Sequence, residues 1–349
     1  MERVTISDVA ERSGVSKSTV SHVINKTRFV EEDTKKRVLK AIEELGYRPS
    51  NVARSMVSKK TKTAGLLISD VGNPFYSEVI LGVEEAARAQ EYNIFLCNTS
   101  YDIQRGMEFI QSLIDKMVDG VLLMSSSMSV ELVDELYNHR IPAVVLDWES
   151  EKVGQRAASV SIQFNTGIHQ AVEYLYRLGH RRFAHVCGPL NLWTARKRKE
   201  DFLTAVEEHG IPISDVLVIE GNLRIDGGRD SMAAIVQEEN RPTAVFAAND
   251  LTALGLIWAA RDYGLQVPED LSIIGLDDIE LASQVNPSLT SVALPRFEIG
   301  SLAMNLLLEL IQLSESGLPD ITKLNRTVTT YLVIRQSTSK PPIFSHQML

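Results

Sequence analysis

The pattern of apolar and polar positions changes once along the chain. The first 48 residues carry three short helical signals, whereas from residue 63 onwards short apolar runs are each followed by a helical stretch. The runs read GLLIS, IFLC, GVLLM and AVVL, then FAHV, VLVI, AVFA and SIIG. Such alternation is typical of βαβ units and parallel sheets. The pattern predicts an N-terminal all-α head followed by an α/β body of two doubly wound parallel-sheet lobes.

The head contains start and stop signals for each helix. Thr5, with an acidic residue three positions on, forms the pattern of a capping box, and Gly14 ends the first helix. Ser16 can cap a second helix over about residues 17–25, and a third helix is expected over about residues 31–45. Three short helices in this order predict a helix-turn-helix unit.

The second predicted helix has one polar face. A step of about 100° per residue places Lys17, Ser18, Ser21 and His22 on one arc. Short polar donors near a helix start are what reading of the DNA major groove needs. A solvated face is the alternative for any lone amphipathic helix. Charge favours DNA, because residues 1–62 hold 14 Lys/Arg against 8 Asp/Glu, and the remainder holds 22 against 37.

Composition is that of a globular protein. Of 349 residues 44% are hydrophobic, and no apolar run approaches the roughly 18 residues of a membrane span. The N-terminus lacks the uninterrupted apolar stretch of a secretory signal, so we expect a cytoplasmic protein with no membrane partner. Cys97 and Cys187 lie far apart with no C-x-x-C motif, and are expected to be reduced core thiols. We expect neither a metal nor a cofactor.

Polar residues follow directly after several apolar runs. They are Asp70, Asp147, Asn249, Asp250, Asp277 and Asp278. Ligands of parallel sheets bind beyond the carboxyl ends of the strands, so these side chains are expected to converge on one cleft. With Arg198 and nearby aromatic rings they suit a polyhydroxylated ligand, and a nucleobase would also fit. For any single Asp, capping of the following helix is the alternative.

The order of the head motifs is specific. The segment TISDVAERSGVSKSTVSHVIN is followed by a third helix and then by YRPSNVARSM. In this order the chain resembles the LacI family of bacterial transcriptional regulators, along nearly its whole length. The resemblance implies that the second helix enters the major groove and that a hinge helix enters the minor groove as a dimeric pair. An apolar side chain, here Met56, would then wedge between base steps and bend the site.

Helix pattern and resemblance together imply a set of DNA contacts. They are Thr5, Ser16, Lys17, Ser18, Thr19, Ser21, His22, Asn25, Asn51, Ala53, Arg54 and Met56. Two of these depart from the family pattern, since His22 stands where Arg is usual and Met56 where Leu is usual. A histidine there would make DNA binding weakly pH-sensitive, and the more flexible Met would specify the kink less well.

Six further segments match the family's body: GNPFYSEV, GPLNLWTARKRKEDF, FAANDLTALG, IIGLDDIELA, PSLTSVALPRFEIG and LVIRQST. The resemblance implies that Phe75 and Tyr76 flank the effector and that Arg198 clamps it. The expected effector contacts are Asp70, Phe75, Tyr76, Asp147, Trp148, Asn191, Trp193, Thr194, Arg198, Leu223, Asn249 and Asp277.

Three positions depart from the family's usual pocket. Asp201 replaces a Gly, Gln163 stands where Asp is common, and Leu223 stands where several members stack an aromatic ring on the ligand. These changes indicate an unusual pocket wall, so the resemblance alone does not name a sugar.

Domain boundaries follow from these patterns. We expect a DNA-binding domain over 1–48, a hinge helix and linker over 49–62, a body over 63–340 and a disordered tail over 341–349. Residues 160–162, 290–293 and 325–326 look like crossovers between lobes. Lobe 1 is therefore expected over about 63–161 plus 293–325, and lobe 2 over about 162–291 plus 326–340. Closure of the lobes would change the angle between two paired bodies and the spacing of their heads on DNA.

Two other functions were weighed against this one. An enzyme could use Asp277 and Asp278 as paired carboxylates, but no Ser/His/Asp order, phosphate loop or metal spacing accompanies them. A periplasmic-type solute-binding protein shares the two-lobed pattern but lacks such a head. The sequence favours a homodimeric DNA-binding regulator, expected to repress, on a pseudo-palindromic operator. Its expected effector is a sugar or sugar derivative, and a protein coeffector on the body stays open.

Overall fold

The computed structural model describes residues 4–25, 27–47, 60–127, 129–148, 150–314 and 321–342. The chain divides into two compact units, Met1–Thr61 and Lys62–Leu349. Four of the expected DNA contacts, Asn51, Ala53, Arg54 and Met56, lie outside the described residues. The same holds for most of the expected hinge and tail.

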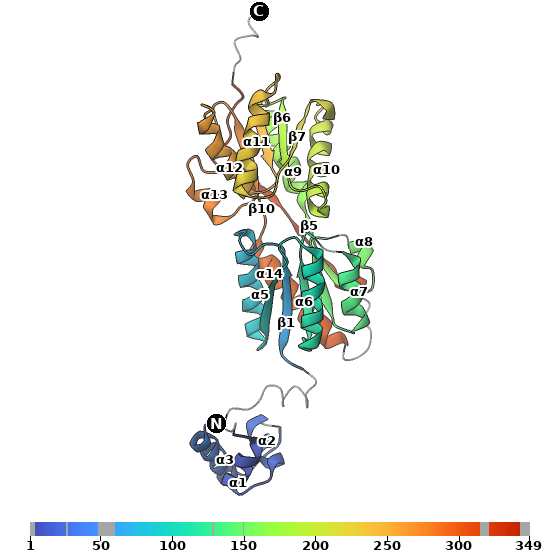
Figure 1. Ribbon diagram of the computed structural model, residues 1–349, viewed down its shortest axis with the longest axis vertical. Coiled ribbons are helices and arrows are strands. Elements are labelled where there is room, and N and C mark those ends of the chain that lie inside the picture. The colour runs from blue at the N-terminus through green and yellow to red at the C-terminus, as the bar shows by residue number, and fades with distance from the viewer. Residues whose placement is uncertain are drawn as a thin grey trace, which may run out of the picture. The chain divides into compact units, whose positions relative to one another are not determined.

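The described residues of the first unit form short helices around a small core. The helices are α1 (Ile6–Ser13), α2 (Lys17–Asn25) and α3 (Glu32–Leu45) (Figure 1). The Asp8 carboxylate accepts a hydrogen bond from the Thr5 backbone N–H at 2.7 Å, and Gly14 ends α1 with a φ of 66°. Val20 and Val38 are fully buried between the helices. The expected helix-turn-helix head is therefore confirmed.

Lobe 1 of the second unit is a parallel sheet with helices on both faces. Its strands are β1 (Thr63–Ile68), β2 (Asn93–Asn98), β3 (Gly120–Met124), β4 (Ala143–Leu146), β5 (Ala158–Gln163) and β11 (Arg326–Thr329). They lie in the order β11-β5-β4-β3-β1-β2. Its helices are α5 (Phe75–Ala89), α6 (Ile103–Asp115), α7 (Val130–Asn138), α8 (Ser150–Val153), α14 (Arg296–Ser314) and the 3-10 turn η2 (Ile321–Leu324). Leu66 packs on the side of α5, and Leu67 packs with α6 and α7, so the central strands β1, β3 and β4 are buried and apolar on both faces.

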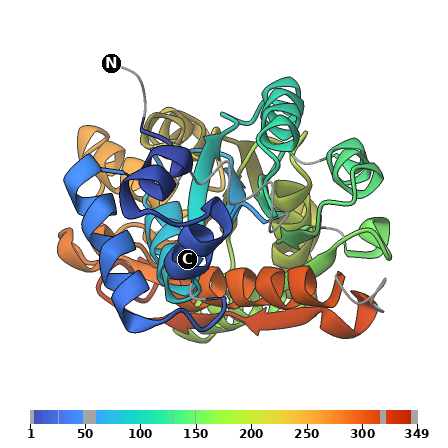
Figure 2. The same ribbon diagram turned by 90° about the horizontal axis from the view of Figure 1, so that it is seen from below.

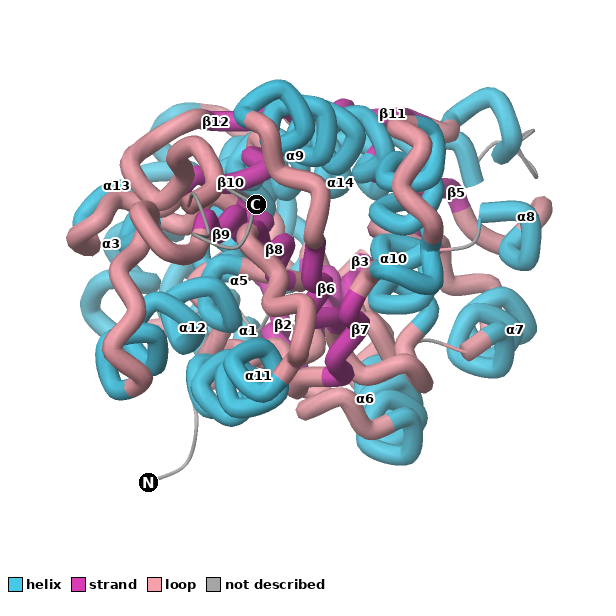
Figure 3. Tube along the Cα trace, turned by 90° about the horizontal axis from the view of Figure 1, so that it is seen from above, coloured by secondary structure: helices cyan, strands magenta, loops and turns pink. Residues whose placement is uncertain are grey.

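Lobe 2 repeats this topology. Its strands are β6 (Phe183–Cys187), β7 (Leu217–Glu220), β8 (Ala244–Ala247), β9 (Ser272–Asp277), β10 (Thr290–Ala293) and β12 (Tyr331–Val333). They lie in the order β12-β10-β9-β8-β6-β7, with β12 antiparallel to β10. Its helices are α9 (Phe164–Leu178), α10 (Trp193–Glu208), α11 (Ile225–Gln237), α12 (Asp250–Asp262), α13 (Glu280–Gln284) and the 3-10 turn η1 (Ile213–Asp215). Figure 3 shows α9 and α10 on one side of these strands and α11 and α12 on the other.

The described chain crosses between the lobes after Gln163, after Ala293 and at Thr330. The expected crossovers at 160–162 and 290–293 instead lie within β5 and β10, and the one expected at 325–326 comes later because β11 pairs with β5 in lobe 1. These strands read ASVSIQ, TSVA and RTVT, and such short polar segments do not reveal which sheet they join. Thr330 is almost fully buried, and its hydroxyl donates to the Gln163 carbonyl at 2.9 Å and accepts from the Gly167 N–H at 3.0 Å.

Helix α14 is the long core helix of lobe 1 (Figure 2). Among the described helices it is long and apolar enough to span a membrane by length and composition, and half of the qualifying window is buried. It packs against α5 and strands β3, β4 and β5, and we interpret it as a core helix. It approaches α5 so closely that a Cβ on Gly300 would lie 2.0 Å from the Val79 carbonyl oxygen.

Gly300→Ala is therefore expected to force α14 and α5 apart. Overpacking against a rigid backbone typically costs about 1–3 kcal/mol, which should lower the urea midpoint of unfolding. Gly106→Ala on α6 is the matched control, since its new methyl would make ordinary contacts with the side chains of Leu132 at 3.4 Å and Thr99 at 3.9 Å, and Ala favours a helix. An unchanged midpoint for Gly300→Ala would contradict this account of the packing.

Candidate functional site

The head presents the polar face of α2. The Ser16 hydroxyl oxygen accepts a hydrogen bond from the Thr19 N–H at 3.1 Å, which caps the start of the helix as expected. Lys17 and Ser18 are exposed in the first turn. His22 lies half-buried in the last turn, and its Nδ1 lies 2.8 Å from the Thr27 hydroxyl.

The remaining expected head contacts lie on or beside the same face. Thr5 is exposed at the start of α1, and Asn25 is exposed at the end of α2 with its amide donating to the Ser21 hydroxyl at 3.2 Å. Ser16, Thr19 and Ser18 are linked through their hydroxyl groups. The exposed donors therefore gather at the beginning of α2, where a groove-reading helix needs them.

The body contains a cleft between its two lobes. In each sheet the strand order reverses beside one strand, at β1 in lobe 1 and at β6 in lobe 2. A reversal of this kind leaves a crevice outside the carboxyl ends of the strands. Loops after β1, β3, β4, β6, β8 and β9 all contribute to one pocket there.

Most of the expected effector residues meet in this inner pocket. Its lining includes Phe75, Tyr76, Asp147, Thr194, Arg198, Leu223, Asn249 and Asp277. Three further expected residues, Trp148, Asn191 and Trp193, line an adjoining outer cavity. Asp70 lines neither, and its carboxylate instead pairs with Arg224 across the lobes at 2.7 Å. Asp201 lies beside the pocket, where it pairs with Lys197 at 2.6 Å.

Arg198 is the cation of the inner pocket. Its guanidinium lies 3.4 Å from the Asp147 carboxylate, so the pair joins α10 of lobe 2 to the loop after β4 of lobe 1. It also stacks on the Phe164 ring, 4.0 Å from the centroid. Its Nε is buried and has no hydrogen-bond partner. An unsatisfied buried donor of this kind is available to a ligand.

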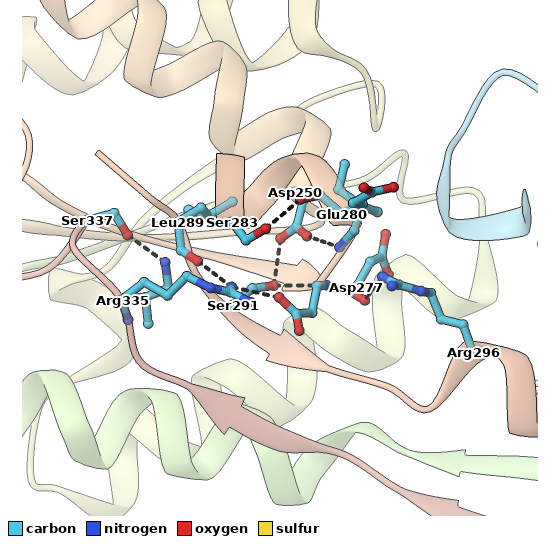
Figure 4. Close-up of polar contacts among 12 residues, drawn as sticks. Asp250, Asp277, Glu280, Ser283, Leu289, Ser291, Arg296, Arg335 and Ser337 are labelled. Atoms are coloured by element: carbon cyan, nitrogen blue, oxygen red, sulfur yellow. Dashed lines mark hydrogen bonds and ion pairs between the residues drawn. The ribbon is translucent and has the colours of Figure 1, made fainter. Parts of the chain in front are cut away.

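Asp277 is held in place by a network behind it (Figure 4). It ends β9 with a φ of 113°, a conformation that a non-glycine residue keeps only where its surroundings impose it. Arg296 donates to the Asp277 carbonyl oxygen at 2.7 Å and pairs with Glu78. Asp250, which lies behind it, accepts from the Ser291 hydroxyl at 2.6 Å. Arg296 therefore ties the end of β9 in lobe 2 to α5 in lobe 1.

Burial sets the charge of the pocket. Desolvation raises the pKa of Asp147 to about 6, against the opposing attraction of Arg198. Desolvation also raises the pKa of Asp277 to about 7, although Arg198 and Arg296 lower it. The pKa of Asp250 is raised well above its ordinary value by burial and by the neighbouring Asp277 charge. The carboxyl groups of the cleft are thus protonated more readily than exposed ones.

Asn249 and Asp250 lie at the start of α12, where the helix cap and the cleft meet. The Asn249 side-chain oxygen Oδ1 accepts a hydrogen bond from the Thr252 N–H at 2.9 Å, which caps α12, while the side-chain Nδ2 donates to the Leu223 carbonyl oxygen at 2.9 Å. Asp250 faces inward and accepts from the Ile279 N–H at 2.7 Å. Asn249 therefore both caps α12 and lines the pocket.

Five polar lining residues were missed by the sequence analysis: Asn73, Tyr101, Ser125, Ser126 and His185. Ser125 and Ser126 directly follow β3, so the same strand-end argument could have found them. His185 lies within β6 and is fully buried, with its Nδ1 2.8 Å from the Phe246 carbonyl oxygen, and nothing in its sequence context indicates a pocket. Among the described residues no group of His, Cys, Asp and Glu could hold a metal ion.

Family comparisons agree with both units. Residues 5–50 match the model "Bacterial regulatory proteins, lacI family", and residues 172–338 match "Periplasmic binding protein-like domain". The HTH-type transcriptional repressor PurR of Haemophilus influenzae (strain PittEE) is 40% identical over 336 residues, covering 95% of this chain and 98% of the relative. Catabolite control protein A of Priestia megaterium is 40% identical over 308 residues, covering 87% and 91%.

Solved structures give the same result. The lac repressor dimer bound to operator and the anti-inducer ONPF matches with a TM-score of 0.85 and 26% identity, over 97% of this chain and all of that chain. A complex of the transcriptional regulator CelR with cellobiose matches with a TM-score of 0.71 and 30% identity, over 96% and 100%. The chain is therefore a DNA-binding transcriptional regulator and belongs to the lacI family of bacterial regulatory proteins.

Proposed function

We propose that this chain is a cytoplasmic repressor that binds a pseudo-palindromic operator as a homodimer and is controlled by a hydroxylated ligand in the inner pocket. The observation that carries the proposal is the pocket itself, in which Asp147, Arg198 and Asp277 converge from both lobes. Carboxylates accept hydrogen bonds from hydroxyl groups, and Arg donates to ring or hydroxyl oxygens. Aromatic rings at Phe75 and Tyr76 supply apolar cover.

A sugar or sugar derivative fits this chemistry better than a nucleobase. Sugars present many hydroxyl donors, and the pocket offers acceptors at both Asp147 and Asp277. Among the similar structures, one holds cellobiose and another, from Enterococcus faecium, holds ribose. Leu223 provides an aliphatic wall, and an aliphatic side chain cannot stack on a flat base as an aromatic ring does.

The ligand would act on DNA binding by changing the closure of the lobes. Three described connections join the lobes, and the ion pairs Arg198–Asp147 and Arg224–Asp70 cross the cleft between them. A ligand that prefers one degree of closure shifts the equilibrium towards it. In a dimer, that shift would alter the spacing of the two heads and hence the affinity for paired half-sites.

A solute-binding protein and an enzyme are the competing functions. The family head at residues 5–50 opposes a pure solute-binding role. The relatives are named as repressors rather than enzymes. In addition, Asp277 and Asp278 do not act as a carboxylate pair, because Asp278 points away to pair with Arg335 at 2.6 Å.

DNA binding is expected to depend steeply on salt. A DNA duplex should first be selected from a random-sequence pool, and its affinity then measured by fluorescence anisotropy. A protein with several phosphate contacts loses about 10³–10⁵ in affinity between roughly 50 and 200 mM salt. Lys17→Ala should weaken binding, whereas Arg177→Ala, the same charge change in lobe 2, should not. An affinity that stays flat with salt would refute the DNA-reading role of α2.

Ligand binding is expected to raise the melting temperature through Arg198. The protein should be melted with a panel of sugars, sugar phosphates, uronates, nucleosides and purines, since a ligand at 100 times its Kd adds about 2.7 kcal/mol to the folded state. The shift caused by a hit should vanish in Arg198→Ala and persist in Arg229→Ala, a surface cation of the same lobe. A hit that is unaffected by Arg198→Ala would place the ligand outside the inner pocket.

The raised pKa of Asp277 gives a pH-dependent stability. Because the pKa of Asp277 is about 7 in the folded protein against an ordinary 3.8, the folded state holds this proton more tightly. Its contribution to the free energy of unfolding is therefore present at low pH and is lost as pH rises through about 4 to 7. The free energy of unfolding of Asp277→Asn should therefore exceed that of the parent by more at pH 8 than at pH 5. Thermal melting at both values checks this, and equal differences at both would contradict it.

A further inference from the structure

An outer cavity adjoins the inner pocket and has walls from both lobes. The two share Tyr101 and Ser126, so a single ligand can extend from one into the other. Lobe 1 contributes Trp148 and Lys152 to the outer cavity, and lobe 2 contributes Trp193 and Arg196. A ligand that fills both would contact both lobes at two separate places.

The two spaces differ in charge. The inner pocket contains two carboxylates, Asp147 and Asp277, and one cation, Arg198. Among its described lining residues the outer cavity contains no carboxylate and two cations, Lys152 and Arg196. Opposite charges attract across short distances, so the outer cavity favours a negatively charged group more than the inner pocket does.

The outer cavity also carries the donors that an anion needs. Arg196 is exposed, and its Nη1 donates to the Leu190 carbonyl at 2.8 Å, which fixes the guanidinium at the cavity wall. Ser126, Ser127 and Ser129 of lobe 1 also line the cavity. Helix α10 begins at Trp193, so its positive N-terminal end adds to the field of the two cations. Guanidinium and hydroxyl donors together are the usual partners of phosphate and carboxylate oxygens.

We propose that the outer cavity is an anion subsite and that the effector has two parts. A hydroxylated part occupies the inner pocket, and a phosphate or carboxylate group occupies the space between Lys152 and Arg196. The indole of Trp193, which is half-buried, covers the link between the two parts. This inference rests on the proposed function, because it extends the same effector site.

The tryptophans allow a first test that needs no known effector. The chain has three tryptophans, of which Trp148 and Trp193 line the outer cavity and Trp258 lies on α12. In Trp258→Phe the fluorescence therefore reports on the outer cavity alone. Iodide, an anion, should quench it more efficiently than caesium, and inorganic phosphate should protect against iodide.

Charge variants make this test specific. In the Trp258→Phe background, Arg196→Gln should remove most of the iodide preference and of the phosphate protection. Lys199→Gln is the matched control, since it removes the same charge from the same helix but lines neither cavity. Equal quenching by both ions, or equal loss in both variants, would overturn the anion subsite. Circular dichroism confirms that each variant is folded.

A second test uses matched ligands and separates this inference from the proposed function. Calorimetric titration should compare D-glucose, D-glucose 6-phosphate and D-glucuronate. The corresponding series for ribose and for fructose should also be titrated. Cellobiose serves as a neutral sugar of two units. An anionic member should bind at least about tenfold more tightly than its neutral parent, as a charge-assisted hydrogen bond allows. Arg196→Gln should abolish that difference and Lys199→Gln should keep it. A preference for the phosphate or for the uronate identifies the anion.

The outcomes are distinct. If a neutral sugar or cellobiose binds as tightly as the anionic compounds, and Arg198→Ala abolishes binding, the anion subsite is wrong and the proposed function stands. If none of these compounds binds, both the sugar effector and the anion subsite are wrong for this series. If anionic compounds bind equally to Arg196→Gln and the parent, the anion lies elsewhere and the inference is overturned.

Discussion

The body depends on the burial of charge at the point where the two lobes meet. Arg198 reaches from α10 of lobe 2 to Asp147 of lobe 1, while Asp277 lies in the same pocket with its pKa raised by desolvation. Charges removed from water are costly unless they are paired and hydrogen-bonded. The Arg198 Nε has no partner in the protein. The pocket is therefore arranged so that a ligand can supply the missing hydrogen bonds and thereby stabilise one degree of lobe closure.

The repeated topology explains why charge converges there. Both sheets have the same strand order, and each has its crevice outside the carboxyl ends of the strands. Polar residues at strand ends are thus brought together from segments far apart in the chain. Crossovers after β5 and β10 and at Thr330 join the sheets, and the Arg296 contacts with Asp277 and Glu78 connect the pocket to α5. A change at the pocket consequently reaches structure in both lobes.

Apolar patterning predicted the architecture, because buried parallel strands are continuous apolar runs. It did not find β5, β10 and β11, whose short segments with Ser and Thr resemble loops, or β12, which is only three residues long. Strand-end reasoning and the family resemblance brought Asp147, Asn249 and Asp277 to the pocket. They misplaced Asp70, whose partner Arg224 is 154 positions away, a separation that no local pattern encodes. The serines after β3 were overlooked because serine is common in turns. Met56, the expected wedge residue, lies outside the described residues.

In the proposed function, ligand binding in the cleft and operator binding by the head are linked through one conformational equilibrium. The most direct measurement is a pair of titrations on the dimer. The first measures the affinity for operator without ligand and at saturating ligand. The second measures the affinity for ligand with and without operator. Thermodynamic linkage requires both affinities to change by the same factor, and we predict a factor of about 5–150. Tight ligand binding that leaves operator affinity unchanged would contradict the account, because the cleft would then not control the head.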